Sequence, residues 1–159
     1  MSVFSAELQS NIKSLVDRYE TKRSSILPIL HAIQDEHGYI KEEHIDELEE
    51  TYGLHRVHVK EVITFYDVYH NDPVPKNLIR YCKNLTCHML GAREAIGKIH
   101  SHIDEYKKKS GGECPIGIEE FPCLGKCDGA PVMLVGKKRY EHMTADKVTE
   151  VLNEYAPLK

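Results

Sequence analysis

Four of the five cysteines in this 159-residue chain occur as two close pairs. Cys82 and Cys87 have four residues between them, Cys123 and Cys127 have three, and about 35 residues separate the pairs. This pattern is typical of a metal site, because soft thiolate ligands prefer zinc, copper(I) or iron-sulfur clusters to hard cations. Four sulfurs complete either a tetrahedral zinc site or the coordination of two bridged irons. The fold must therefore bring the two segments to one point.

The spacing leaves three alternatives open. Structural zinc sites usually draw on pairs with two intervening residues, and neither pair here has that spacing. The four residues between Cys82 and Cys87 let a loop wrap a flat two-iron centre, as in plant-type ferredoxins, which favours a 2Fe-2S cluster. Structural zinc is the second alternative, and disulfides or unrelated thiols are the third. We interpret Cys114, which precedes Pro115 at an expected strand start, as a non-ligand.

Composition and motifs exclude several classes of protein. The N-terminus lacks the basic start and apolar core of a signal peptide, and no apolar run reaches membrane-spanning length, so we expect a cytoplasmic protein without membrane insertion. A disulfide framework is disfavoured in that compartment. The net charge of -4 argues against a nucleic-acid partner. No dinucleotide-binding, P-loop, H-E-x-x-H or G-x-S-x-G motif occurs, so we expect the chain to bind neither nicotinamide nor flavin on its own.

Residues 1–70 are expected to form a helical domain. The predicted helices span about 5–19, the stretch from an N-cap at Ser24 to a stop at Gly38, then 42–52 and about 56–69. Pro28 falls in the first turn of the second helix, where its missing N-H costs nothing. The fourth helix carries an apolar stripe that we expect to pack on other helices or on a partner: Val59, Val62, Ile63, Tyr66 and Tyr69.

Residues 71–76 are expected to form a linker, because two prolines two apart disfavour helix and central strand. Beyond it, residues 77–159 alternate between strand and helix patterns and predict a small mixed sheet with helices packed on it. The predicted strands are 77–82, 116–121 and 132–135, the predicted helices are about 90–102 and 144–155, and Lys107 to Lys109 are expected in an exposed loop. Each cysteine pair should then follow a strand, in a loop. There Gly125 and Gly129 would leave backbone N-H groups free to bond sulfur.

The chain resembles a known family at these residues. RYCKNLTCHMLGA, CLGKCDGAPVMLV, LPILHAIQDEHGYI and VHVKEVITFYDVY are similar to segments of the small 2Fe-2S subunit in the NADH-oxidising module of respiratory complex I. The resemblance covers nearly the whole chain and implies an α+β fold, a helical bundle followed by a thioredoxin-like 2Fe-2S ferredoxin domain. It also implies that Cys82, Cys87, Cys123 and Cys127 hold one 2Fe-2S cluster, one pair for each iron, and that Pro131 follows a cis peptide bond.

The same resemblance implies an electron-transfer subunit of NADH:quinone oxidoreductase, without an active site of its own. A larger partner subunit would bind FMN and NADH, and the chain would reach the cytoplasmic face of the inner membrane only through that complex. We expect Val59, Ile63, Tyr66 or Tyr69 to contact or support the partner, and Asp128 to lower the reduction potential. The alternatives are the equivalent subunit of an NAD-linked hydrogenase or formate dehydrogenase, and a zinc-stabilised interaction module.

Overall fold

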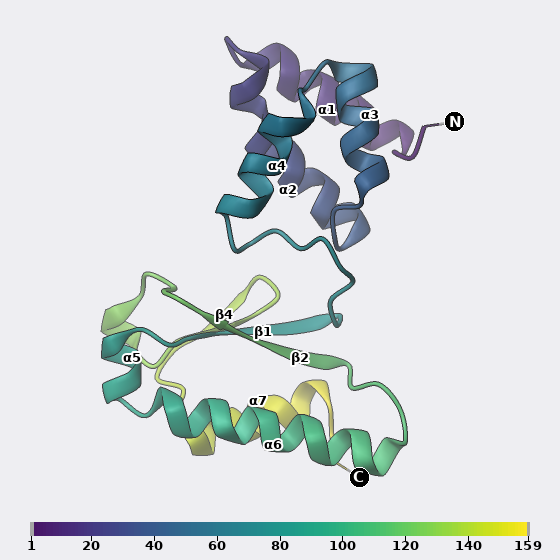
Figure 1. Ribbon diagram of the computed structural model, residues 1–159. Coiled ribbons are helices and arrows are strands. Elements are labelled where there is room, and N and C mark those ends of the chain that lie inside the picture. The colour runs from purple at the N-terminus through teal and green to yellow at the C-terminus, as the bar shows by residue number, and fades with distance from the viewer. Residues whose placement is uncertain (1, 159) are drawn as a thin grey trace. The chain divides into compact units, whose positions relative to one another are not determined.

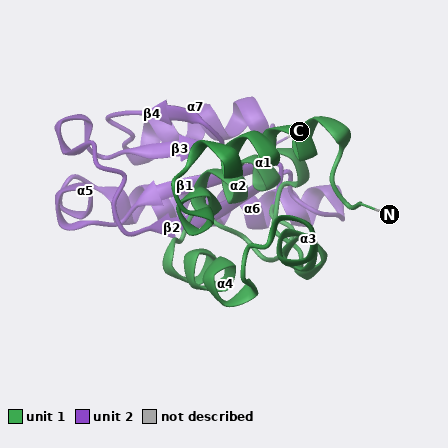
Figure 2. Ribbon diagram, turned by 90° about the horizontal axis from the view of Figure 1, so that it is seen from above, with its two compact units in different colours: residues 1–74 green, residues 75–159 purple. Residues whose placement is uncertain are grey.

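The computed structural model describes residues 2–158, and the chain divides into two compact units between Val74 and Pro75 (Figure 2). This junction lies within residues 71–76, the stretch expected to be a linker. Unit 1, which ends at Val74, is helical, whereas unit 2, which begins at Pro75, contains a four-stranded sheet with helices. This architecture is the predicted α+β class.

Unit 1 is built from four α-helices and one 3-10 turn: α1 (Ala6–Arg18), η1 (Lys22–Ser25), α2 (Ile26–His37), α3 (Glu42–Tyr52) and α4 (Arg56–Phe65). Their apolar residues recur at helical spacing and close one buried core, in which Ile12, Ile33 and Val59 have no exposed surface. Gly38 and Gly53 end α2 and α3 with φ angles of 83° and 67°, which confirms both predicted stops.

Two boundaries predicted for unit 1 are wrong. Ser24 does not cap α2, because it lies inside η1, where the Thr21 side chain accepts the Ser24 N-H. Helix α4 ends at Phe65 rather than near residue 69. Contacts with α2 favour the non-helical turn that follows, since the Tyr69 hydroxyl donates to the Leu27 carbonyl at 2.9 Å. Tertiary hydrogen bonds thus override the helical pattern of the sequence.

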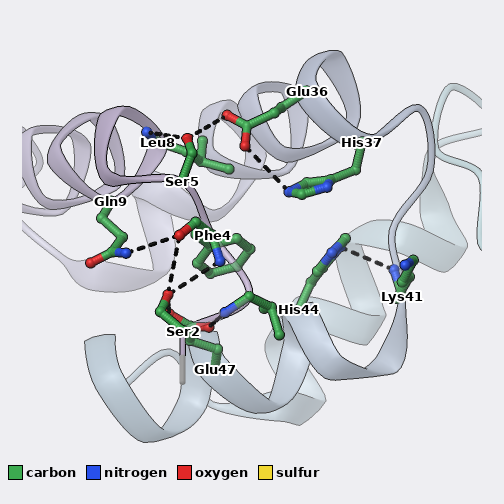
Figure 3. A network of polar contacts seen from close by, with 11 residues as sticks. Ser2, Phe4, Ser5, Leu8, Gln9, Glu36, His37, Lys41, His44 and Glu47 are labelled. Atoms are coloured by element: carbon green, nitrogen blue, oxygen red, sulfur yellow. Dashed lines mark hydrogen bonds and ion pairs between the residues drawn. The ribbon is translucent and has the colours of Figure 1, made fainter.

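The N-terminal segment is tied to helices α2 and α3 (Figure 3). The Val3 N-H donates to the Glu47 carboxylate at 2.7 Å, and the Ser5 hydroxyl donates to Glu36 at 3.0 Å. Phe4 is buried and its ring lies 5.5 Å from that of His44. His44 is itself buried, and its Nδ1 accepts the Lys41 N-H at 3.2 Å. Polar and aromatic contacts thus close this end of the unit 1 core.

Unit 2 places two long helices on one face of its sheet (Figure 1). Its elements are β1 (Asn77–Cys82), α5 (Leu85–Met89), α6 (Ala92–Ser110), β2 (Ile116–Phe121), η2 (Cys127–Gly129), β3 (Met133–Val135), β4 (Lys138–Tyr140) and α7 (Ala145–Tyr155). The strand order is β2-β1-β3-β4, with β1 and β2 parallel and the other neighbours antiparallel. The sheet is therefore mixed, as expected, and α6 and α7 cover its core side.

The helical stretch after β1 differs from the prediction. Gly91, with a φ of 97°, separates a short helix α5 from α6, and α6 continues to Ser110 instead of ending near residue 102. Lys107 to Lys109 therefore lie in the last turn of α6 and not in a loop. Cations are favourable at this end of a helix, because its free carbonyls carry partial negative charge. The prediction also missed β4, which follows β3 through a turn at Gly136.

Candidate metal centre

The first cysteine pair is built into regular structure, which corrects the expectation that both pairs lie in loops. Cys82 is the last residue of β1, and Cys87 lies in helix α5, whose N-cap Asn84 accepts the Leu85 N-H. Both are buried, with 3% and 2% of their surface exposed. The two side chains are hydrogen-bonded to each other.

Burial raises the pKa of the Cys87 thiol, and the neighbouring thiols of Cys82 and Cys127 raise it further. The Val132 N-H donates to the same sulfur and acts in the opposite direction. A thiol in this environment stays protonated unless a cation takes the place of its proton. Cys82 and Cys87 thus form a buried sulfur pair, with an amide donor, at the end of β1.

The second pair is exposed and lies between β2 and β3. Cys123 follows the end of β2, and Cys127 begins the 3-10 turn η2. The Gly125 N-H donates to the Cys123 sulfur at 3.4 Å, and Gly125 has a φ of 70°. This confirms the expectation for Gly125. The expectation for Gly129 is wrong, because its N-H donates to the Lys126 carbonyl at 3.3 Å and is not free to bond sulfur. The second pair is thus held by a loop rather than by the sheet.

Three of the four thiols are close enough to interact electrostatically, namely Cys82, Cys87 and Cys127. Within residues 2–158, however, no three His, Cys, Asp or Glu side chains are arranged as a set able to hold a metal ion. The donors fit an iron-sulfur or zinc centre in their chemistry, since they are thiols accompanied by N-H groups directed at sulfur. The assignment of all four as ligands remains part of our proposal below.

Cys114 lies at the other end of the sheet. It is buried in the core just before β2, whose first residue, Ile116, pairs with Asn77 at the start of β1. Cys82 pairs with Phe121 at the far end of both strands. Five residue steps of about 3.3 Å put these ends about 17 Å apart. The structure therefore separates Cys114 from the other thiols.

A second stretch of chain, which sequence reasoning did not identify, supports the loop that holds Cys127. The His142 N-H donates to the Gly129 carbonyl at 2.7 Å, and the Met143 N-H donates to the Pro131 carbonyl at 2.9 Å. The peptide bond between Ala130 and Pro131 is cis, as the resemblance implied. No motif marks His142 and Met143, because their contribution comes from backbone hydrogen bonds that any residue type except proline could make.

Charged side chains flank the same loop. Lys126 pairs with Asp128 and lies 4.0 Å from Glu141, which also accepts from the Arg139 Nε at 3.0 Å. The hydrogen bond from Lys126 lowers the pKa of Asp128. The negative charge predicted to lower the reduction potential is therefore paired with a cation next to Cys127.

Exposed apolar side chains gather on α5 and the residue after it. Leu85 and Met89 are 70% and 76% exposed, and Leu90 is exposed as well. We call these three residues the α5 patch. Sequence reasoning missed this patch, because a helix of five residues is too short to show a helical period. Large apolar side chains exposed together are typical of a surface that binds another protein.

The apolar stripe predicted for the fourth helix divides into two parts. Val59, Ile63 and Tyr69 are buried within the unit 1 core, which counts against direct contact with a partner. Tyr66 is exposed, and the neighbouring Phe65, which was not among the predicted contact residues, is the most exposed large apolar side chain in the part of the chain that the structure describes. Of the predicted residues, Tyr66 alone stays available for a contact.

None of the helices found in residues 2–158 combines the length and the apolar character needed to cross a bilayer.

Comparison with known proteins identifies the family to which this chain belongs. Residues 12–156 match the model of the thioredoxin-like 2Fe-2S ferredoxin family. An NADH-quinone oxidoreductase subunit from Aquifex aeolicus is 30% identical over 155 residues, which cover 96% of this chain and 95% of that protein. An NADH-quinone oxidoreductase subunit from Rhizobium meliloti is 27% identical over 93% of this chain and 88% of that protein. The chain, with its four-stranded mixed sheet and paired cysteines, belongs to the thioredoxin-like 2Fe-2S ferredoxin family.

Proposed function

We propose that this chain is an electron-transfer subunit of an NADH:quinone oxidoreductase, and that it exchanges single electrons with a flavin in a larger, NADH-binding partner subunit. One 2Fe-2S cluster would be held by Cys82, Cys87, Cys123 and Cys127, with FMN and NADH on the partner alone. When bound, such a cluster accepts and releases one electron at a time. The names of the relatives and the family match support this assignment.

The observation that carries the proposal is the buried pair Cys82 and Cys87, whose side chains are hydrogen-bonded to each other beside the Val132 N-H at the end of β1. Cys127 is near enough to this pair to interact with it electrostatically. The sheet and α5 hold the first two sulfurs and keep water from them, while the Val132 N-H stabilises negative charge on Cys87. The Gly125 N-H does the same for Cys123. These contacts fit sulfurs that must carry negative charge in both oxidation states of a cluster.

Electron exchange requires a partner close to the sulfurs, and the α5 patch is suited to this role. Leu85, Met89 and Leu90 are exposed on the segment that carries Cys87. A partner bound there would cover the apolar surface and bring its flavin toward the same end of unit 2. The chain would reach the cytoplasmic face of the membrane only through this complex. The proposal therefore needs no membrane-spanning segment in this chain.

Two experiments test the proposed function. We expect the protein, purified without oxygen, to be red-brown and to take up about one electron per chain from dithionite, as a single 2Fe-2S cluster requires. NADH alone should leave its visible absorption unchanged, and NADH with the flavin-binding subunit should bleach it. Bleaching by NADH without that subunit would contradict the division of roles, and a colourless protein with one zinc per chain would support the interaction module instead.

Co-purification of the subunits distinguishes the related complexes. If the flavin-binding subunit that co-purifies also brings a hydrogenase or a formate dehydrogenase subunit, the electron-transfer chemistry holds while the complex is reassigned.

A further inference from the structure

The loop that carries Cys127 is attached to a distant part of the sequence by main-chain hydrogen bonds. His142 donates to the Gly129 carbonyl at 2.7 Å and Met143 donates to the Pro131 carbonyl at 2.9 Å. Both bonds come from the segment that follows β4. Glu141, at the start of this segment, is the residue whose side chain also reaches the loop.

The Glu141 side chain lies against Gly129. A Cβ atom built on Gly129 would lie 2.8 Å from the carboxyl carbon of Glu141, so this approach is possible only because residue 129 has no side chain. The carboxylate accepts from the Arg139 Nε at 3.0 Å and lies 4.0 Å from the Lys126 Nζ. Lys126 immediately precedes Cys127. The carboxylate therefore lies between a cation on β4 and a cation on the cysteine loop.

Asp128 cannot provide the same connection. Its side chain is 74% exposed, and it pairs with Lys126 only two residues away on the same loop. That contact links the loop to itself, whereas Glu141 links it to β4. Glu141 and Lys126 are both about one-third exposed, so solvent screens their attraction less than it screens that of Asp128.

We propose that Glu141 is a positioning residue for the metal centre, which holds the Lys126–Cys127 part of the loop against β4 and adds negative charge beside the sulfurs. This inference rests on the proposed function, because it concerns the same cysteines. Two consequences follow. Without the carboxylate the loop is released more often, so a bound cluster is lost faster. Without its charge, with Lys126 less neutralised, a reduced cluster is stabilised and the reduction potential rises.

The test compares Glu141→Gln with Glu154→Gln in the full chain, loaded with iron and sulfide. Glu154 lies on α7, and its carboxylate is 3.7 Å from the Lys138 Nζ on β4. Its substitution removes the same charge as Glu141→Gln and also breaks an ion pair with β4. It breaks no ion pair with the cysteine loop. For Glu141→Gln we expect the visible absorption to decay about threefold faster in excess iron chelator, the size expected from one partly exposed ion pair. Its potential should be higher than that of the wild type, with shifted EPR g values. Glu154→Gln should match the wild type in all three measurements.

Gly129→Ala provides an independent route, since it forces the Glu141 carboxylate away without changing any charge. We expect it to accelerate cluster loss as Glu141→Gln does, with an unchanged thermal midpoint of the metal-free protein showing that the fold is intact. Equal decay rates, potentials and EPR spectra in the wild type, Glu141→Gln and Glu154→Gln would overturn the role of Glu141. A wild-type protein that shows no cluster would instead overturn the proposed function, so the two failures are distinguishable.

Discussion

The two units of this chain differ in what they leave on their surfaces. Unit 1 contains no cysteine, and its predicted docking stripe is largely core, with Val59, Ile63 and Tyr69 buried. Unit 2 contains all five cysteines, leaves Cys123 and Cys127 exposed, and carries the α5 patch on the segment that holds Cys87. Unit 1 also exposes apolar side chains, among them Phe65 and Tyr66, but unit 2 combines such side chains with thiols, which unit 1 lacks. The proposed redox chemistry therefore belongs to unit 2.

The largest expected difference between the two units is the response to losing the cluster. We expect Cys87→Ala to abolish the EPR signal of the reduced protein, because alanine offers no donor atom in place of one of the four proposed ligands. Amide resonances of unit 1 should stay where they are in the wild type. Cys114→Ala is the matched control and should keep the signal, since the structure places that thiol at the other end of the sheet. A full signal in Cys87→Ala would contradict the assignment of the site.

The second effect belongs to unit 1 and concerns His44. Burial, followed by the nearby His37 and Lys41, lowers its pKa from 6.5 to about 4, against the opposing influence of Glu43 and Glu47. Between pH 6.5 and about pH 4 the unfolded chain thus binds more protons than the folded one. The contribution of neutral His44 to the free energy of unfolding is fully present above pH 6.5. It falls as pH decreases through this window, by up to about 3 kcal/mol.

Urea unfolding of the metal-free protein between pH 7 and pH 4 measures this loss, with resolved amide resonances reporting each unit separately. The loss should appear in unit 1, and His44→Gln should reduce the slope of stability against pH. An unchanged slope in the variant would mean that groups other than His44 cause the acid sensitivity.

The third effect distinguishes the two cysteine pairs within unit 2. In the metal-free protein we expect iodoacetamide to modify Cys123 and Cys127 at least about tenfold faster than Cys82 and Cys87, because thiol reactivity requires exposure and thiolate character. Mass spectrometry of peptides after brief exposure gives the four rates. Uniform rates would show that the buried pair opens readily and is not preformed.

The smallest effect on stability is expected at the two exposed apolar sites. Met89→Ser in the α5 patch and Phe65→Ser in unit 1 should each change the free energy of unfolding by no more than about 0.5 kcal/mol, because both side chains are already in water. Met89→Ser should reduce co-purification of the flavin-binding subunit more than Phe65→Ser does. The reverse order would move the main docking surface to unit 1.

Local patterns in the sequence predicted much of this structure. The strands 77–82 and 116–121 and the glycine stops at Gly38 and Gly53 needed only neighbouring residues, because periodicity and backbone freedom determine them. The C-terminal end of α4 could not be found in this way, since the Tyr69 hydroxyl and its partner on α2 are distant in sequence. The same holds for Glu141, because its carboxylate lies against Gly129 and near Lys126, which are distant from it in the sequence.

The most direct test of the central claim is low-temperature EPR of the anaerobically purified full chain, before and after dithionite, with iron and zinc quantified on the same sample. Our account predicts a silent oxidised state, a single S = 1/2 signal on reduction and about two irons per chain. Stoichiometric zinc, with no signal in either state, would contradict it and leave the four cysteines with a structural role only.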